Sequence, residues 1–482
     1  MMNAKAASLL LAGLLSGCAL MRNDLPAHAQ IPVEKVRLAD DIRLARQDWP
    51  QAQWWRRYAD PQLNALVERA LKGSPTIAMA RARMEQAGSQ VELLNAGSDL
   101  QVTALAMMNR QYTSANGFMG PYAADAPVLG LTGPWYTEGT LGAFAGLNVD
   151  LWARERSQVE AAVGAQNARV AEQYVVELEL SAEVAQLYFS IQTNHQLLEL
   201  MKRSEAILQY AVQAHQGKAG TGLEARVPLH GARAQLLSVQ REMAQINGQI
   251  RQTRETLRAL LGAGPDDLPD IRPMPLPQLA VGLPDDIPYQ LLSRRPDLQA
   301  MRWYVQSSFS EIDAARAAFY PSFSIKAFFG LDSIHLASLF KGDSKQMNLI
   351  PGFYLPLFDG GRLNANLHNV RAGSNMMIEQ YNQAVLNAVR DIAVSGSRLQ
   401  SLDEERRLQL EKIEAARYGQ LSVEAMNRHG LSSRLAASEA GLPVIAEQTS
   451  LLLLDAQRLS QNVVLIKALG GGYDARQVAM AR

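Results

Sequence analysis

The sequence predicts a mixed α/β membrane protein made of two similar halves, and three observations support this prediction. Two segments without proline, 156–213 and 363–428, carry apolar residues at the spacing of a long packed helix. Stretches that read as β-strands, with alternating apolar and polar residues, precede each long helix. Short motifs recur in the same order about 200 residues apart, which indicates an internal repeat.

Composition limits the class of protein. Of the 482 residues, 48% are hydrophobic and 20% are charged, as in a folded protein. Lys+Arg and Asp+Glu both number 47, so the chain lacks the basic surface of a nucleic-acid binder. The one cysteine, Cys18, excludes an intramolecular disulfide and a metal site with several cysteines. Beyond the N-terminus, no apolar run reaches the roughly 18 residues of a membrane-spanning helix.

The first residues have the features of a bacterial lipoprotein signal peptide. Lys5 precedes the apolar run 6–15, which is too short to span a bilayer as a helix. The run ends in Leu15-Ser16-Gly17-Cys18, which resembles a lipobox. We therefore expect Cys18 to carry an S-diacylglycerol and an N-palmitoyl group, and the following Ala19 favours delivery to the outer membrane. The alternative is an ordinary signal peptide ahead of a buried cysteine.

The two halves are visible as matched motifs. The matches are Ser74-Pro75 with Arg295-Pro296, Leu151-Trp152 with Leu357-Phe358, Gly222-Leu223 with Gly430-Leu431, and Leu261-Gly262 with Leu469-Gly470. Each match is weak alone, but their common order predicts two halves of about 200 residues. Seven of the 21 prolines fall between residues 265 and 288, which predicts an extended linker there because proline cannot donate a backbone hydrogen bond.

These features divide the chain into six expected parts. They are a lipoprotein signal peptide (1–17), a lipid-anchored extension (18–62), the first half (63–264), the Pro-rich linker (265–288), the second half (289–470) and a C-terminal tail (471–482). We expect each half to run helix, β-hairpin, long helix, turn, helix. The first helices should start at Pro75 and Pro296, because proline is favoured in the first helical turn. The turns after the long helices are expected at Gly217–Gly222 and His429-Gly430.

Four strands are expected, two before each long helix. The clearest is 323–329, where apolar residues alternate with Ser324 and Lys326; the others are 349–358, 100–108 and 140–152, and 112–139 is expected to be a loop. The alternative is an ordinary soluble hairpin. The predicted lipid anchor and strands near the 9–11 residues that a membrane strand requires argue for a membrane sheet. Because two hairpins cannot close a barrel, the remaining strands would come from other protomers.

Several motifs resemble those of the TolC-like outer membrane factors, in the lipoprotein branch of efflux channels. They are the lipobox at Cys18, Asp150-Leu151-Trp152, Arg294-Arg295-Pro296-Asp297-Leu298, residues 317–321 (Ala-Ala-Phe-Tyr-Pro), residues 356–362 (Pro-Leu-Phe-Asp-Gly-Gly-Arg) and residues 468–473. The resemblance covers essentially the whole mature chain. It implies a homotrimer in which each protomer gives four strands to one 12-stranded outer-membrane barrel and its helices to a long periplasmic α-barrel. It also implies a periplasmic adaptor protein and an inner-membrane pump as partners.

The sequence departs from the family pattern at three places. Ala153 stands where many relatives have glycine, and Tyr473 stands where tryptophan is frequent. Relatives often carry aspartates just after the second turn, and these form a cation-binding constriction. Here residues 430–435 contain no aspartate. An acidic ring is therefore not carried over. The candidate residues of a polar or ion-paired periplasmic gate are Glu224, Arg226, Ser432, Arg434 and Glu439. Solvated charges at helix ends are the alternative.

No motif points to catalysis. The seven histidines show no ligand spacing, and the chain has no GxSxG and no Walker phosphate loop. We therefore expect no enzyme activity, metal or cofactor beyond the covalent lipid. The expected function is an outer-membrane exit channel that passively conducts drugs or other small toxic compounds out of a tripartite efflux system. The alternative is a lipid-anchored periplasmic coiled-coil scaffold or adaptor without a pore.

Overall fold

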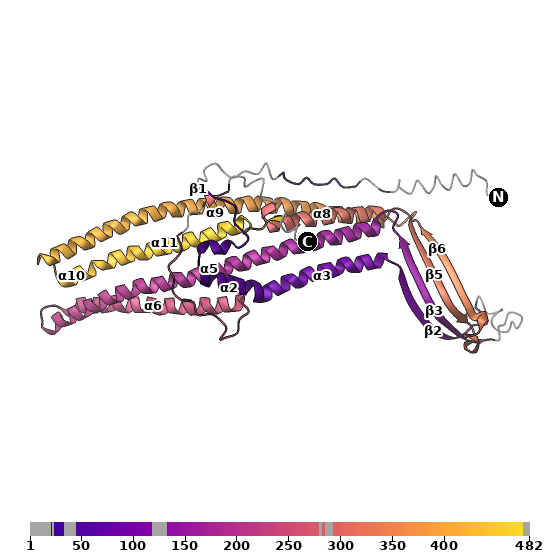
Figure 1. Ribbon diagram of the computed structural model, residues 1–482, viewed down its shortest axis with the longest axis horizontal. Helices are drawn as coiled ribbons and strands as arrows, with labels where there is room; N and C mark the ends of the chain where they lie inside the picture. Colours follow the sequence, from indigo (N-terminus) through magenta and orange to yellow (C-terminus); the bar gives the residue numbers. More distant parts are fainter. Residues whose placement is uncertain are drawn as a thin grey trace. The chain divides into compact units, whose positions relative to one another are not determined.

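A computed structural model describes residues 21, 24–32, 45–117, 133–278, 282–284 and 293–475 (Figure 1). The chain forms two compact units. Unit 1 comprises Met1–Ala29, Glu85–Asn167 and Trp303–Glu379, and unit 2 comprises Gln30–Met84, Ala168–Arg302 and Gln380–Arg482. Four helices contribute residues to both units.

Helices make up most of the described chain. They are α2 (Pro61–Gly73), α3 (Pro75–Ser98), α5 (Arg154–Gly220), α6 (Arg226–Leu260), α8 (Pro296–Ala317), α9 (Arg362–Arg428), α10 (Arg434–Glu439) and α11 (Gly441–Ala468), with short 3-10 helices at η3 (Trp54–Tyr58), η5 (Leu336–Ser338) and η6 (Gly342–Ser344). No helix among the described residues is long and apolar enough to cross a membrane.

The two long helices lie where the sequence predicts them. Both α5 and α9 have 67 residues, which corresponds to about 100 Å at 1.5 Å per residue. The predicted end of α5 was wrong, because the helix continues through Gly217 to Gly220. Glycine inside a helix costs only about 1 kcal/mol, so these two glycines do not stop it. The chain reverses after Gly222, whose φ is +73°.

Four strands form one antiparallel sheet in unit 1. They are β2 (Gln101–Tyr112), β3 (Trp135–Val149), β5 (Ser322–Ser333) and β6 (Lys345–Tyr354), in the order β2-β3-β5-β6. All four lie near the predicted positions, but several predicted boundaries were wrong. β2 and β5 run on to Tyr112 and Ser333, four residues beyond the predicted ends. β3 begins at Trp135 because this end pairs with Tyr112 of β2, in a stretch predicted as loop. β6 ends at Tyr354, so the apolar Leu357 and Phe358 follow the strand.

Helices α3 and α8 begin at Pro75 and Pro296 as predicted. The end of α6 lies against the start of α3, and the end of α11 lies against the start of α8. A Cβ on Gly262, after α6, would lie 2.7 Å from the Gly73 carbonyl oxygen, and one on Gly470, after α11, would lie 1.9 Å from that of Arg294. Both glycines have a positive φ. Only glycine permits this close backbone approach.

The core of unit 2 includes the segment just before α2. Trp54, Trp55 and Tyr58 of η3 are buried in one cluster with residues of α2, α5, α6 and α11. The Tyr58 hydroxyl donates to Asn462 Oδ1 at 2.8 Å, and burial raises the pKa of Tyr58 above its usual range. Asp60 caps α2 by accepting from the Gln62 amide. Residues that the sequence assigned to an N-terminal extension therefore belong to this core.

The described part of the Pro-rich segment, residues 265–278, contains neither helix nor strand. A short strand after it, β4 (Gly282–Leu283), pairs in parallel with β1 (Ala45–Arg46). Residues 279–281 and 285–288 of the predicted linker lie outside the described residues.

The passage from strand to long helix is capped by an aspartate in both halves. Asp150 accepts from the Arg156 amide at 2.9 Å, and Asp359 accepts from the amides of Gly361 and Leu363 at 2.9 and 2.8 Å. The bond from Leu363 lowers the pKa of Asp359. Such caps satisfy amides that have no partner within the helix.

Replacing Ala153 with glycine is expected to stabilise the protein. Ala153 has φ +58°, a left-handed conformation that disfavours a Cβ, and this explains why glycine suits the position. The gain should be about 1 kcal/mol, partly offset by the greater freedom of glycine in the unfolded chain. Thermal unfolding of the purified protein in detergent measures it, with Ala165→Gly inside α5 as a control that should lower the midpoint. A lower midpoint for Ala153→Gly would contradict the strain argument.

Candidate functional site

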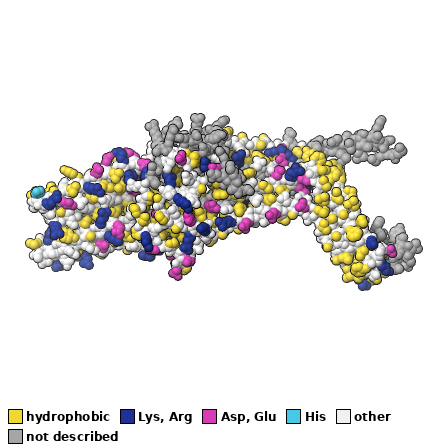
Figure 2. Space-filling model, viewed as in Figure 1, with side chains coloured by type: hydrophobic (Ala, Val, Ile, Leu, Met, Phe, Trp, Pro, Cys, Tyr) yellow, Lys and Arg dark blue, Asp and Glu magenta, His cyan; other side chains and the backbone are white. Residues whose placement is uncertain are grey.

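The sheet of unit 1 separates an apolar face from a polar face. Residues that are paired across the strands lie on one face, and successive residues alternate. The register therefore places these residues together on one face: Val102, Ala104, Ala143, Ala145, Leu147, Ile325, Phe329, Met347, Leu349 and Phe353. It places these on the other: Thr103, Thr140, Asn148, Ser324, Asp332, Gln346 and Asn348. Hydrophobic side chains cover the sheet in Figure 2.

The polar face has its own hydrogen bonding and one aromatic pair. Thr140 Oγ1 donates to Asp332 Oδ1 at 3.1 Å. Phe144 and Phe328 lie with their ring centroids 4.6 Å apart. The Phe328 ring covers Gly142, where an added Cβ would meet it at 2.7 Å. This face therefore presents mainly polar groups, as the water-filled side of a membrane barrel does.

Both edge strands are open in a single chain. In the described part of the chain, β2 pairs only with β3 and β6 only with β5. The two edge strands have 12 and 10 residues, which is the length of a strand that crosses a membrane. Unpaired backbone groups cannot face lipid. Within the described residues, both edges of the sheet therefore lack the partner strand that lipid would require.

Helix α9 carries an exposed apolar stripe in unit 2. Leu386, Val394, Leu408, Tyr418 and Leu421 are 46%, 60%, 47%, 76% and 59% exposed. Leu386 and Leu421 are five heptads apart, and Val394 and Leu408 are two heptads apart. At 3.5 residues per turn the two pairs lie about 100° apart with Tyr418 between them, so all five residues fall within one half of the helix surface. Such a stripe is typical of a helix that packs against further helices.

The two helical turns of unit 2 share one geometry. Leu223 N–H donates to the Lys218 carbonyl at 2.9 Å, and Leu431 N–H donates to the Met426 carbonyl at 2.8 Å. Gly222 and Gly430 adopt φ +73° and +74°, as in the Schellman motif that ends many helices. The leucine after each glycine is about 80% exposed, with values of 81% and 79%. Both turns thus present an apolar tip.

The predicted gate residues do not pair with one another. Glu224 Oε2 instead lies 2.7 Å from His215 Nδ1, and both side chains are mostly buried. The Arg434 guanidinium lies 5.9 Å from the ring centroid of Tyr210. Among the described residues no ion pair joins two of the predicted charges, because partners on α5 lie closer. No pattern in the sequence singles out His215, one of the seven histidines without ligand spacing.

The other predicted gate residues lie at helix ends. Arg226 is the first residue of α6, and Glu439 is the last residue of α10. The Ser432 carbonyl accepts from Asn427 Nδ2 at 2.7 Å, and the neighbouring Ser433 caps α10. Leu435 packs with Ala211 of α5 and Ala232 of α6. The two helical hairpins are therefore in contact through an apolar cluster, which the sequence did not predict.

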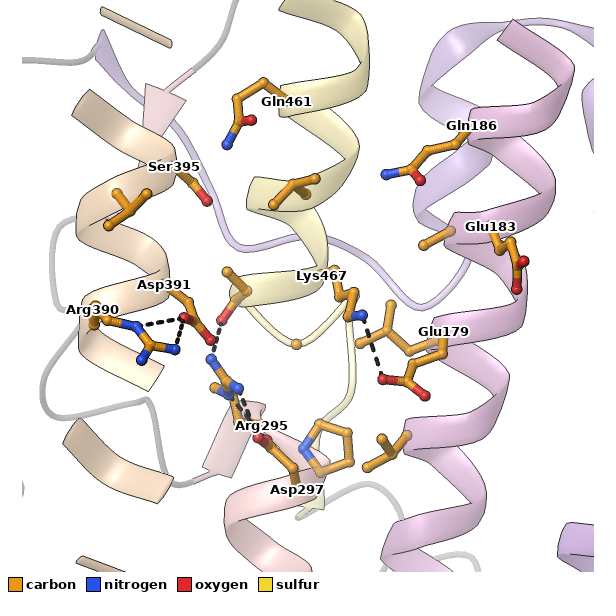
Figure 3. A pocket seen from close by; sticks show the side chains of 18 residues that line it. Glu179, Glu183, Gln186, Arg295, Asp297, Arg390, Asp391, Ser395, Gln461 and Lys467 are labelled. Atoms are coloured by element: carbon orange, nitrogen blue, oxygen red, sulfur yellow. Dashed lines mark hydrogen bonds and ion pairs between the residues drawn. The ribbon is translucent and has the colours of Figure 1, made fainter. Parts of the chain in front are cut away.

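A groove of about 860 Å³ in unit 2 explains the Arg295-Pro296-Asp297 motif. Arg295 donates to both carboxylate oxygens of Asp297, at 3.0 and 2.6 Å, and to the Ala468 carbonyl at 3.1 Å. It thereby joins the end of α11 to the start of α8 (Figure 3). Lys467 pairs with Glu179 at 3.4 Å, and Arg390 pairs with Asp391 at 2.8 Å. The groove is thus a helix junction in which Arg295, Lys467 and Arg390 each pair with a carboxylate.

The family model described as outer membrane efflux protein matches residues 66–263 and 287–471. The chain belongs to this family. It is 59% identical to the multidrug resistance outer membrane protein MdtP of Escherichia coli (strain K12) over 465 residues, 96% of this chain and 95% of that protein. It is 38% identical to MdtQ of Escherichia coli O157:H7 over 470 residues, 95% of this chain and 96% of that protein.

The fold matches solved outer-membrane channels. VceC of Vibrio cholerae superposes with a TM-score of 0.78 and 28% identity, over 88% of this chain and 100% of that chain. These similarities confirm the expected outer-membrane localisation and the efflux-channel function.

Members of the outer membrane efflux protein family are channel proteins rather than enzymes. Within the described residues, no group of three His, Cys, Asp or Glu side chains could hold a metal ion.

The predicted lipid-attachment residue Cys18 lies outside the described residues. The first residue after Cys18 that the structure describes is Met21.

Proposed function

We propose that three copies of the chain close one 12-stranded barrel in the outer membrane, continued by a periplasmic α-helical barrel, and that drugs or other small toxic compounds leave the cell through it. The four-stranded sheet carries this proposal. It has an apolar face, a polar face and two open edges, so closure by further copies would satisfy the edges and enclose a polar lumen. The exposed stripe of α9 would be covered in the same assembly.

The two halves are proposed to be structural repeats of one unit. Each contains a hairpin, a 67-residue helix, a Schellman turn and a returning helix. In each half the returning helix ends at a positive-φ glycine against the first helix. Recurrence of the same backbone contacts at Gly262 and Gly470 supports duplication of one ancestral half.

Transport through the channel is proposed to be passive. A wide water-filled pore selects by width and lining rather than by chemistry, so energy would come from an inner-membrane pump. A periplasmic adaptor protein would bind the exposed tips at Leu223 and Leu431. Opening would separate Leu435 of one hairpin from Ala211 and Ala232 of the other. A lipid on Cys18, which becomes the first residue once residues 1–17 are removed, would hold the protein in the outer membrane.

Disulfide crosslinking between the open edges tests the assembly. In a chain with Ala104→Cys on β2 and one of Met347→Cys, Leu349→Cys or Pro351→Cys on β6, oxidation should give covalent dimers and trimers. All these residues lie on the apolar face, and a disulfide requires Cα atoms within about 7 Å. The chain contains no cysteine besides Cys18, which simplifies the background. Non-reducing gel electrophoresis of outer membranes measures the products.

The matched control is Ala145→Cys with Leu349→Cys. These positions face the same side, but Ala327 of β5 lies between them, so their strands are about 9.5 Å apart in one sheet. This pair should give no covalent trimer. Monomers alone from every β2–β6 pair, in cells with functional efflux, would contradict the trimeric barrel.

A further inference from the structure

The chain just after Cys18 is fixed to the body of unit 1. Met21 packs on an apolar cluster formed by the last turns of α8, the residues just after it and the first turns of α9. The cluster contains Ile312, Ala315, Phe319, Leu363 and Leu367. Cys18 precedes Met21 by three residues, and three residues span at most about 11 Å. Any lipid on Cys18 is therefore attached close to this cluster.

Asp24 clamps the same segment. Its Oδ2 accepts from Arg371 Nη2 at 2.6 Å, from Arg371 Nε at 3.1 Å and from Arg316 Nη2 at 3.1 Å. The Asp24 and Arg371 side chains are 17% and 9% exposed, so solvent screens the pair little. The Arg371 bond holds the pKa of Asp24 below its usual range. The clamp therefore stays ionised at neutral and mildly acidic pH.

The segment then follows α9. Asn375 Oδ1 accepts from the His28 amide at 3.0 Å, and Asn375 Nδ2 donates to the Pro26 carbonyl at 3.1 Å. His28 Nδ1 lies 2.7 Å from Glu379 Oε1. Arg371, Asn375 and Glu379 are spaced by four and lie on one face of the helix. The segment thus runs in the direction of α9, with its Cys18 end toward the helix start.

An open groove of about 620 Å³ lies at that start. Phe319 and Leu363, which belong to the cluster that Met21 packs on, also line it, together with Pro356, Leu357 and Phe358. Leu357 and Phe358 are 64% and 93% exposed. Large apolar side chains so exposed after the last strand indicate an apolar occupant. Because Cys18 is only three residues from Met21, a lipid on Cys18 can reach this groove.

We propose that this groove seats an acyl chain of the lipid on Cys18, and that Asp24 positions the chain for it. The proposal rests on the lipidation of Cys18 put forward under the proposed function. It assigns a role to the exposed Leu357-Phe358 pair, and it makes the anchor part of the folded protein rather than a free tether.

Photo-crosslinking in the full-length lipoprotein tests the seat. With p-benzoylphenylalanine in place of Phe358, irradiated cells should yield a crosslink from this position to the acylated N-terminal peptide. The matched control places the same amino acid at Met347, which is 76% exposed on the apolar face of β6. This position should crosslink free lipids only. Mass spectrometry of the purified protein identifies the crosslinked peptides and the lipid on Cys18.

The outcomes separate the two proposals. A lipid on Cys18 with crosslinks from position 358 only to free phospholipid, or only to a second copy of the chain, would overturn the acyl seat and leave the anchor standing. An intact mass without lipid would overturn both. A crosslink to the acylated peptide at 358 and not at 347 supports the seat.

A second variant tests the clamp. Asp24→Asn removes the charge that Arg371 and Arg316 share and should lower the crosslink yield at position 358 about tenfold, without changing the lipid mass. Asp313→Asn is the matched control, because Asp313 also contacts Arg316, at 3.5 Å, but does not touch the N-terminal segment. Equal crosslink yields for the two variants would show that Asp24 does not position the N-terminal segment.

Discussion

Replacing Leu349 with arginine is expected to prevent assembly of the protein in the outer membrane. Leu349 is 72% exposed in the single chain and lies mid-strand on the apolar face, in register with Ala327. An arginine facing lipid at mid-depth costs about 2–4 kcal/mol per copy, and the proposed trimer would carry this cost three times. Folded protein in the outer-membrane fraction, scored by resistance to SDS and protease, should fall strongly.

The neighbouring position provides the control. Asn348 lies in the same strand on the opposite, polar face, in register with Phe328. Asn348→Arg should leave assembly close to wild type because water solvates the new charge. The pair of variants thus differs in face but not in depth or strand. If Leu349→Arg and Asn348→Arg assembled equally well, the assignment of lipid and water to the two faces would be wrong.

The second large effect is expected for Gly470→Ala at the junction of α11 and α8. Gly470 adopts φ +87°, and a Cβ there would lie 1.9 Å from the Arg294 carbonyl oxygen. Backbone cannot yield as a flexible side chain does, so the helix ends must separate and the bond from Arg295 to the Ala468 carbonyl is lost. The destabilisation should reach about 3 kcal/mol or more.

Thermal unfolding in detergent measures this loss, with Gly248→Ala as control. Gly248 lies inside α6, and a Cβ there would meet nothing within 4 Å. Alanine should therefore raise helix stability by about 1 kcal/mol at this position. An unchanged midpoint for Gly470→Ala would mean that the junction does not hold the two helices together.

The predictions that were wrong concern the ends of elements, which depend on pairing between distant residues. The sequence placed a turn at Gly217, but the flanking residues favour helix and only Gly222 needs a positive φ. It ended a strand near Phe358 because the apolar run continues, although pairing stops at Tyr354. The polar or ion-paired gate of Glu224, Arg226, Ser432, Arg434 and Glu439 stays a prediction. Within the single chain, Glu224 contacts His215 and Arg434 contacts Tyr210.

The sequence by itself determined the elements of this protein, because the information is local. Proline at the first turn set the starts of α3 and α8, the absence of proline over more than 60 residues allowed α5 and α9, and glycine set the turn at Gly430. Motifs spread over the mature chain also sufficed for the family. These features need only spacing and residue type, which a single chain displays.

Only the tertiary structure decided which residues meet across the chain. The register that puts Leu349 with Ala327, the clamp of Asp24 by Arg371 and Arg316, and the contact of Gly470 with Arg294 each join residues whose separation no local pattern encodes. Charged residues in particular offer many partners of equal chemistry. The choice among them follows from which backbones packing brings within reach, and that depends on the whole fold.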